Sequence, residues 1–99
     1  MGKKIIWTPE AEQTFTQVVD YLHTEWTDKE VRNFITLTDT IVRLIAEYPH
    51  IGRHSLKKDS REVIVTKHNL LLYKEYVERI DLISFFDTRQ HPRKKPKAK

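Results

Sequence analysis

A chain of 99 residues makes one domain with one hydrophobic core. It contains no cysteine, which excludes a disulfide framework, a thiolate metal site and a cysteine nucleophile. No apolar run approaches the roughly 20 residues that span a bilayer, and the N-terminal residues MGKKIIW lack the apolar core of a signal peptide. These features predict a soluble, cytoplasmic protein without a membrane contact.

The net charge of +4 is concentrated in two short segments. Residues 89–99 hold six basic residues and no acidic one, and the rest of the chain has 12 of the 18 basic residues against 14 acidic ones. The second basic segment is residues 53–61. Such patches can contact a nucleic acid or another target, although solubility explains a basic tail equally well. The candidate contact residues are Arg53, Lys57, Lys58, Arg93, Lys94 and Lys95.

A short candidate strand, residues 4–7, precedes the first predicted helix. Thr8 is a good N-cap and Pro9 suits the first helical position, so we expect a helix to begin at Pro9. Apolar residues then recur every three or four positions up to Trp26, near which this helix ends.

A second helix is predicted to begin at the segment TDKE, residues 27–30. This segment matches a capping box, in which Thr27 caps the backbone and Glu30 bonds back to the cap. Another apolar stripe follows, and Pro49 ends the helix. Because the turn between the two helices is short, we expect them to form an antiparallel hairpin.

The last third of the chain predicts an antiparallel meander of three strands. Its apolar runs are short and rich in Val, Ile, Leu, Phe and Tyr, and they cover residues 63–65, 70–73 and 80–86. We expect His68-Asn69 at the first hairpin tip, because Asn tolerates the left-handed conformation. The element order therefore predicts an α+β fold, with an N-terminal strand and a two-helix hairpin packed on a mainly antiparallel C-terminal β-sheet.

Residues 1–92 are expected to form this single domain. Within it, Arg53 to Ser60 is mostly polar and has no periodicity, so we interpret it as a mobile loop. Residues 93–99 read RKKPKAK and have no large apolar residue to anchor them, which is typical of a disordered tail.

The predicted strands carry apolar residues on both faces. In the last strand, Ile80 and Leu82 alternate with Ile83 and Phe85, whereas a sheet with one wet face alternates apolar with polar residues. The surplus needs a cover. The loop, the tail or a homodimer could supply it, and so could a dedicated partner chain.

The remaining residue types give no sign of a metal site or a cofactor. The five histidines are scattered, and no pair has a recognised metal-ligand spacing. Trp7 and Trp26 are expected to fill the core between helices and sheet rather than to stack on bases. We therefore predict no metal and no cofactor.

Three segments carry a likeness to a known family. They are the helix exit YPHIGR, the strand pair REVIVTKHNLLLY and the closing strand IDLISFFDTRQHP. With the element order, they make residues 4–92 resemble the RelE/ParE superfamily of type II toxin-antitoxin toxins. The resemblance implies a small bacterial growth inhibitor, neutralised by a cognate antitoxin that lays a partly disordered segment across it. Such an antitoxin would supply the missing apolar cover.

The superfamily has two main activities. RelE-type members cleave mRNA in the ribosomal A site with basic residues, whereas ParE-type members inhibit DNA gyrase. The ribonuclease branch tends to place basic residues at strand positions that correspond here to Glu62, Ile64 and Leu70, and none of these is basic. The resemblance therefore favours a ParE-like, non-catalytic inhibitor of DNA gyrase. The alternative is a RelE-like, ribosome-dependent mRNA endonuclease, which leaves open whether the chain is an enzyme.

If the chain is a ribonuclease, its candidate catalytic residues are Arg61, Arg89 and His91. Attack by a 2′-OH without a metal needs a base, an acid and a cation that stabilises charge on the phosphate. His91 is the natural acid or base near neutral pH, and the two arginines could hold a phosphate. In the other interpretation, Arg61 and Arg89 cap strand ends or pair with Glu62 and Asp87, and His91 is only exposed.

Overall fold

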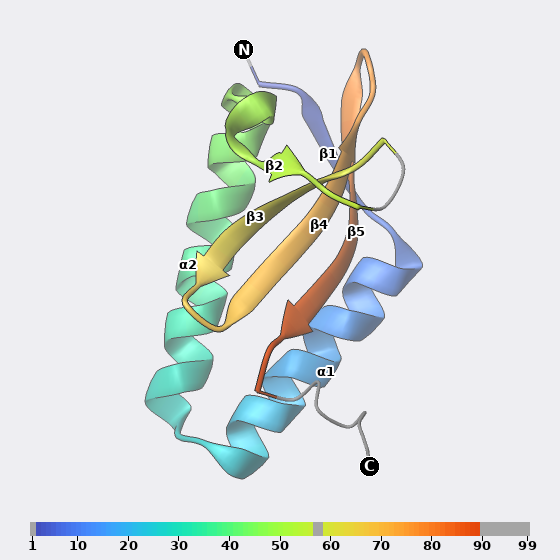
Figure 1. Cartoon of the computed structure of the whole chain (residues 1–99). Helices are drawn as coiled ribbons and strands as arrows, with labels where there is room; N and C mark the ends of the chain where they lie inside the picture. Colours follow the sequence, from blue (N-terminus) through green and yellow to red (C-terminus); the bar gives the residue numbers. More distant parts are fainter. Residues whose placement is uncertain (1, 57–58, 90–99) are drawn as a thin grey trace.

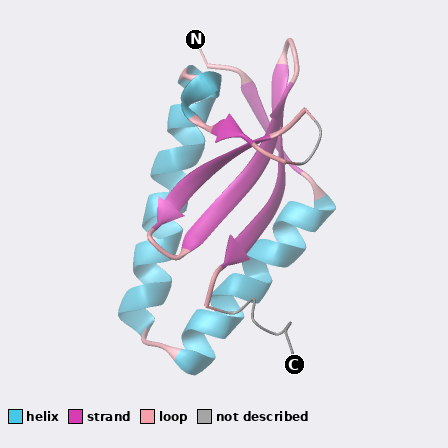
Figure 2. Cartoon of the chain, viewed as in Figure 1, coloured by secondary structure: helices cyan, strands magenta, loops and turns pink. Residues whose placement is uncertain are grey.

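The computed structural model describes residues 2–56 and 59–89. Two helices lie against one face of a five-stranded sheet (Figure 1, Figure 2). Across the sheet the strand order is β1-β5-β4-β3-β2, with β1 parallel to β5 and all other neighbours antiparallel. This is the predicted α+β architecture. The elements are β1 (Lys4–Trp7), α1 (Pro9–Glu25), α2 (Asp28–Glu47), the 3-10 helix η1 (Pro49–Ile51), β2 (Arg53–His54), β3 (Arg61–Thr66), β4 (Asn69–Glu75) and β5 (Arg79–Asp87).

Both helices begin at the predicted caps. Thr8 Oγ1 accepts a backbone hydrogen bond from the first turn of α1 at 3.0 Å and donates to the Leu82 carbonyl at 2.7 Å, which ties α1 to β5. Thr27 Oγ1 accepts from the Glu30 backbone N–H at 3.2 Å. The Glu30 carboxylate is directed to Arg89, 3.6 Å away, so the other half of the predicted capping box is wrong. Neither described helix is long and apolar enough to cross a bilayer.

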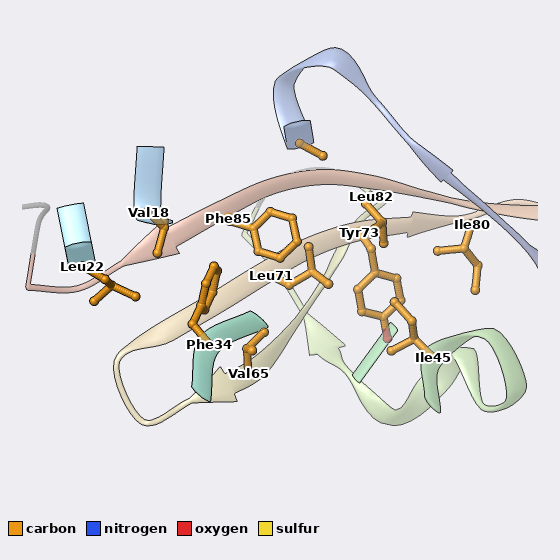
Figure 3. Close-up of a cluster of buried hydrophobic side chains, with 11 residues drawn as sticks. Val18, Leu22, Phe34, Ile45, Val65, Leu71, Tyr73, Ile80, Leu82 and Phe85 are labelled. Atoms are coloured by element: carbon orange, nitrogen blue, oxygen red, sulfur yellow. The ribbon is translucent and has the colours of Figure 1, made fainter. Parts of the chain in front are cut away.

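The core lies between the two helices and the covered face of the sheet (Figure 3). Four aromatic rings pack at its centre with centroids 5.2 to 6.0 Å apart, and they belong to Trp7, Phe15, Phe34 and Phe85. Burial of each large apolar side chain contributes roughly 1.5–3 kcal/mol. The helices are therefore held on the sheet by this cluster and by the buried aliphatic residues around it, Val18, Leu22, Ile45, Val65, Leu71, Ile80 and Leu82.

A β-bulge in β5 decides which of its residues join the core. The pairing of β4 with β5 skips Ile83, which is therefore an extra residue in β5. The extra residue shifts the alternation of side chains, so Phe85 lies on the covered face together with Ile80 and Leu82. The prediction that Phe85 faces away from Ile80 and Leu82 is wrong, because strict alternation holds only while every residue has a partner.

The first hairpin turns at Lys67-His68 and not at the predicted His68-Asn69. Asn69 is already the first residue of β4, and its buried side chain donates to Asp87 Oδ2 at 2.7 Å. Among the described residues other than glycine, only Asp59 has a left-handed backbone, with φ at 59°. Asn69 is therefore placed by its side-chain hydrogen bond and not by tolerance of the left-handed conformation.

The segment from Arg53 to Ser60, predicted as a mobile loop, begins with a strand. Arg53 and His54 form β2, which pairs with the first two residues of β3. Farther along, the Ser55 N–H donates to the Ser60 carbonyl at 3.0 Å, and this hydrogen bond brings the two ends of the remaining loop together. Lys57 and Lys58 lie outside the described residues, as does the predicted tail, 93–99.

Candidate functional site

Helices cover one face of the sheet, and apolar side chains remain exposed on the other. Ile64 of β3 and Phe86 of β5 are 62% and 42% exposed, and both pair with the half-buried Leu70 of β4 that lies between them. We call this surface, defined by Ile64, Leu70 and Phe86, the open sheet face. A hollow of about 240 Å³ reaches from it to η1 and β2 and is lined by Ile51, Arg53, Glu62, Val63, Ile64 and Leu70. A clustered apolar surface of this kind is typical of a protein-binding site.

The edge of the sheet beside the open sheet face is largely unpaired. β2 has two residues and pairs only with Arg61 and Glu62 of β3. Within the described chain, no strand lies beside Val63–Thr66 on the side away from β4. Unpaired backbone groups at a sheet edge can accept another extended segment. Edge and face together therefore offer backbone hydrogen bonds next to apolar contacts.

Arg53, a predicted contact residue, is engaged at the rim of this surface. Its Nη2 and Nε atoms donate to Glu62 Oε1 at 2.6 and 2.9 Å. The pair joins β2 to β3 and compensates the charge of both residues. Glu62, whose position the resemblance compares with a basic residue of the ribonuclease branch, thus accepts both of these hydrogen bonds from Arg53.

The side chain of Arg61, the first residue of β3, bonds to the connection between η1 and β2. Its Nη1 donates to the Gly52 carbonyl at 2.7 Å, and the Gly52 N–H donates to the Tyr73 hydroxyl at 3.0 Å. The same hydroxyl donates to the Pro49 carbonyl at 2.6 Å, and burial raises the pKa of Tyr73. A Cβ at Gly52 would lie 2.5 Å from the Tyr73 hydroxyl, so only glycine fits there. The alternative that Arg61 pairs with Glu62 is wrong, since Glu62 binds Arg53.

Arg89 belongs to a compact polar cluster at the opposite end of the sheet. Its backbone N–H, Nε and Nη2 donate to the Asp87 carboxylate at 2.8, 3.2 and 3.0 Å, and Asn69 donates a fourth hydrogen bond. Asp87 is 2% exposed. Burial by itself works to raise the pKa of Asp87, but the hydrogen bonds from Arg89 and Asn69 outweigh it and hold the pKa below its ordinary value. The alternative that Arg89 pairs with Asp87 is confirmed.

Trp26 lies at this polar cluster and not in the core, so its predicted position is wrong. The indole is 47% exposed, and the Arg89 guanidinium lies 4.5 Å from its ring centroid. Its Nε1–H donates to the Tyr21 hydroxyl at 3.3 Å. Apolar spacing along α1 suggested a core position, but Trp26 is the C-cap residue and has left the helical path. We call Asp87, Arg89, Glu30 and Trp26 the Arg89 corner.

The structure does not bring the candidate catalytic residues Arg61 and Arg89 together. Arg61 begins β3 and is level with Tyr73, which pairs with Leu82 of β5. Asp87 pairs with Asn69, which is four residues from Tyr73 along β4, or about 13 Å at roughly 3.3 Å per residue, and Arg89 lies beyond Asp87. The two arginines therefore cannot hold one phosphate between them. His91 lies outside the described residues, as do Arg93, Lys94 and Lys95.

A third polar cluster, which sequence patterns did not indicate, anchors the N-terminus. Lys3 Nζ lies 2.8 Å from Glu75 and His50 Nε2 lies 2.9 Å from the same carboxylate. The hydrogen bond from Lys3 is the main cause that lowers the pKa of Glu75. The three residues are 25 or more positions apart in the chain, so only the fold brings them together. In the described part of the chain, no three His, Asp or Glu side chains are grouped so that they could hold a metal ion.

Comparison with known proteins agrees with this geometry. A family model described as the ParE toxin of the type II toxin-antitoxin system parDE matches residues 5–92. This chain belongs to the ParE toxin family. It is thus a toxin of a type II toxin-antitoxin system within the RelE/ParE superfamily, and the predicted resemblance is confirmed. None of the curated proteins matches the sequence.

Solved structures share the fold of this ParE-family chain at low sequence identity. The chromosomal ParDE system from P. aeruginosa has a TM-score of 0.73 at 11% identity, with 86% of this chain and 95% of that chain covered. A YoeB/ParE toxin from Agrobacterium tumefaciens has a TM-score of 0.60 at 12% identity, with 85% of this chain and 96% of that chain covered. The E. coli DinJ-YafQ toxin-antitoxin complex has a TM-score of 0.62 at 10% identity, with 92% of this chain and 98% of that chain covered. The predicted toxin fold is confirmed.

Proposed function

We propose that this ParE-family toxin inhibits DNA gyrase in the cytoplasm by binding and without catalysis. The observation that carries the proposal is the chemistry of the open sheet face. Glu62, Ile64 and Leu70 correspond to strand positions where the ribonuclease branch tends to place basic residues, and all three lie on that face. A surface with an internally paired carboxylate and exposed aliphatic groups suits a protein contact better than a phosphate contact.

The positions of the arginines also support binding without catalysis. Arg61 and Arg89 lie at opposite ends of the sheet, and each donates its hydrogen bonds to groups of the chain itself. Catalysis of RNA cleavage requires cationic donors aimed at one phosphate. Breaking either set of internal bonds to reach a substrate would leave buried partners such as Asp87 unsatisfied.

We further propose that a cognate antitoxin covers the open sheet face and the unpaired edge at Val63–Thr66. The ParDE system and the DinJ-YafQ complex, whose structures share this fold, are toxin-antitoxin assemblies. An extended antitoxin segment would pair with the β3 edge and bury Ile64 and Phe86. Burial of apolar surface contributes about 25 cal/mol per Å², so covering these side chains would favour binding of the antitoxin.

The test compares DNA supercoiling and mRNA integrity after induction of the chain alone. We expect supercoiling to change while translated mRNAs stay intact, and purified chain to inhibit gyrase supercoiling in a dose-dependent way. Unimpaired gyrase at a large excess of the chain would refute the proposal. Early cleavage of translated mRNA that is lost in a His91→Ala variant would establish the endonuclease alternative.

A further inference from the structure

A second cavity lies at the elbow between α1 and α2, on a different part of the molecule from the open sheet face. Its volume is about 600 Å³, within the range of about 300–1,000 Å³ that is usual for binding sites. It shares no lining residue with the hollow beside the open sheet face. We call it the elbow pocket, and the residues that matter here are Trp26, Glu30, Asn33, Leu37, Lys67 and Arg89.

The indole of Trp26 is exposed in this pocket and makes two contacts within the chain that favour one orientation. Arg89 lies 4.5 Å from the ring centroid and Tyr21 accepts from Nε1. Arg89 is itself fixed by its bonds to Asp87. A side chain that is already immobilised loses little entropy on binding, and tryptophan is among the residues that dominate binding energy at interfaces. Trp26 is therefore built as an anchor, although it adds little to the core of its own chain.

Among the described residues, the charged side chains at the elbow pocket pair with one another, except for Lys67. Arg89 is balanced by Asp87 at 3.0 Å and by Glu30 at 3.6 Å. Lys67, in the turn between β3 and β4, is exposed and forms no ion pair within the part of the chain that the structure describes. A carboxylate is the group that Lys67 would attract.

We propose that the elbow pocket binds the protein target of the toxin, through a segment that carries an apolar side chain next to a carboxylate. The apolar side chain packs on Trp26 and Leu37, and the carboxylate pairs with Lys67. An apolar centre with a polar rim is the usual anatomy of a protein interface. The inference rests on the proposed function, and it separates target binding at the elbow from antitoxin binding at the open sheet face.

The experiment measures binding to purified DNA gyrase and growth arrest for matched variants. Lys67→Glu reverses the charge at the rim, and Lys29→Glu makes the same change at an exposed lysine of the first turn of α2, outside the pocket. Trp26→Ala removes the anchor and Trp26→Phe keeps an aromatic ring. We expect Lys67→Glu and Trp26→Ala to weaken gyrase binding about tenfold or more and to abolish growth arrest. Lys29→Glu should match the parent chain, and thermal unfolding should show that Lys67→Glu is folded.

Several results would overturn the assignment. Equal gyrase affinity and growth arrest in Lys67→Glu and Lys29→Glu would remove the pocket from target binding. Loss of neutralisation by the antitoxin in Lys67→Glu, with toxicity kept, would make the pocket an antitoxin site. Binding of a short single-stranded oligonucleotide that depends on Trp26 would replace the protein partner by a nucleic acid.

Failure of the proposed function can be told apart from failure of the pocket. If the parent chain arrests growth without binding gyrase, the gyrase proposal is wrong. Growth arrest by the variants then tests by itself whether the elbow pocket binds the target. Arrest that is lost in Lys67→Glu and kept in Lys29→Glu would still assign the elbow pocket to the target. A parent chain that does not arrest growth at all would overturn both proposals.

Discussion

The Arg89 corner and the open sheet face show two opposite ways to use side chains near a surface. At the corner, Asp87 is 2% exposed and its carboxylate accepts four hydrogen bonds from Arg89 and Asn69. On the open sheet face, Ile64 is 62% exposed, and no strand among residues 2–56 and 59–89 pairs with the edge of β3 beside it. Of the charged candidate residues that the structure describes, Arg53, Arg61 and Arg89 all bond to groups within the fold. Ile64, an aliphatic residue of a predicted core strand, remains exposed. Whether a side chain can bind a partner thus depends on whether the fold has already supplied its hydrogen bonds or buried its apolar surface.

The largest expected effect comes from removing the acceptor at the corner. Asp87→Ala leaves the Arg89 guanidinium and the Asn69 amide without their buried partner, and breaking such a pair costs about 3–5 kcal/mol. Chemical denaturation should show a drop of that size in the free energy of unfolding. Asp39→Ala, which breaks an exposed pair with Arg43, is the matched control and should cost about 0.5 kcal/mol or less. Similar losses in both variants would show that the corner is not special.

Acid should reveal the same carboxylate. The pKa of Asp87 is lower in the folded chain than its unfolded value of about 4. The hydrogen bonds of Asp87 therefore contribute their full stability above that value, and the contribution is lost as pH falls from about 4 toward the folded pKa. The free energy of unfolding, measured from pH 6 downward, should decrease less steeply below about pH 4 in Asp87→Asn than in the parent chain, because the asparagine side chain cannot titrate. Parallel curves for the two chains would contradict the assignment.

The ion pair beside the open sheet face should contribute much less than the one at the corner. Arg53 is 74% exposed at its side chain and Glu62 is 23% exposed. Exposed pairs of this kind contribute about 0–1 kcal/mol. We expect Glu62→Gln to lower the free energy of unfolding by no more than that, with a smaller difference at high salt. A loss as large as that of Asp87→Ala would remove the contrast between the two regions.

The smallest effect on stability is expected on the open sheet face itself. Ile64→Lys should change the free energy of unfolding by about 0.5 kcal/mol or less, as is usual for exposed positions. The same substitution should abolish neutralisation by the antitoxin in co-expression, because it puts a charge into the proposed interface. Val77→Lys changes an equally apolar residue, 89% exposed in the β4–β5 turn, and should leave neutralisation intact. Neutralisation that survives Ile64→Lys would place the antitoxin elsewhere.

The sequence predicted the elements well because their signals are local. Thr8 and Thr27 cap the helices as expected, since a cap needs only the three residues that follow it. The α+β order followed from the same patterns. The candidate site was predicted less well: one interpretation paired Arg89 with Asp87 correctly, but Trp26 was assigned to the core.

Signals within the sequence were enough to determine where the helices begin, and that the last third of the chain forms a meander of strands. Only the tertiary structure decided the bulge at Ile83, the partner of Glu30 and the exposure of Trp26. Each of these depends on residues far apart in the chain, for example Glu30 and Arg89 across the end of the sheet. The register of β5 against β4 is set by how all the strands and helices pack at once, so no single stretch of sequence contains it. The surfaces proposed for the antitoxin and for the target arise from that packing.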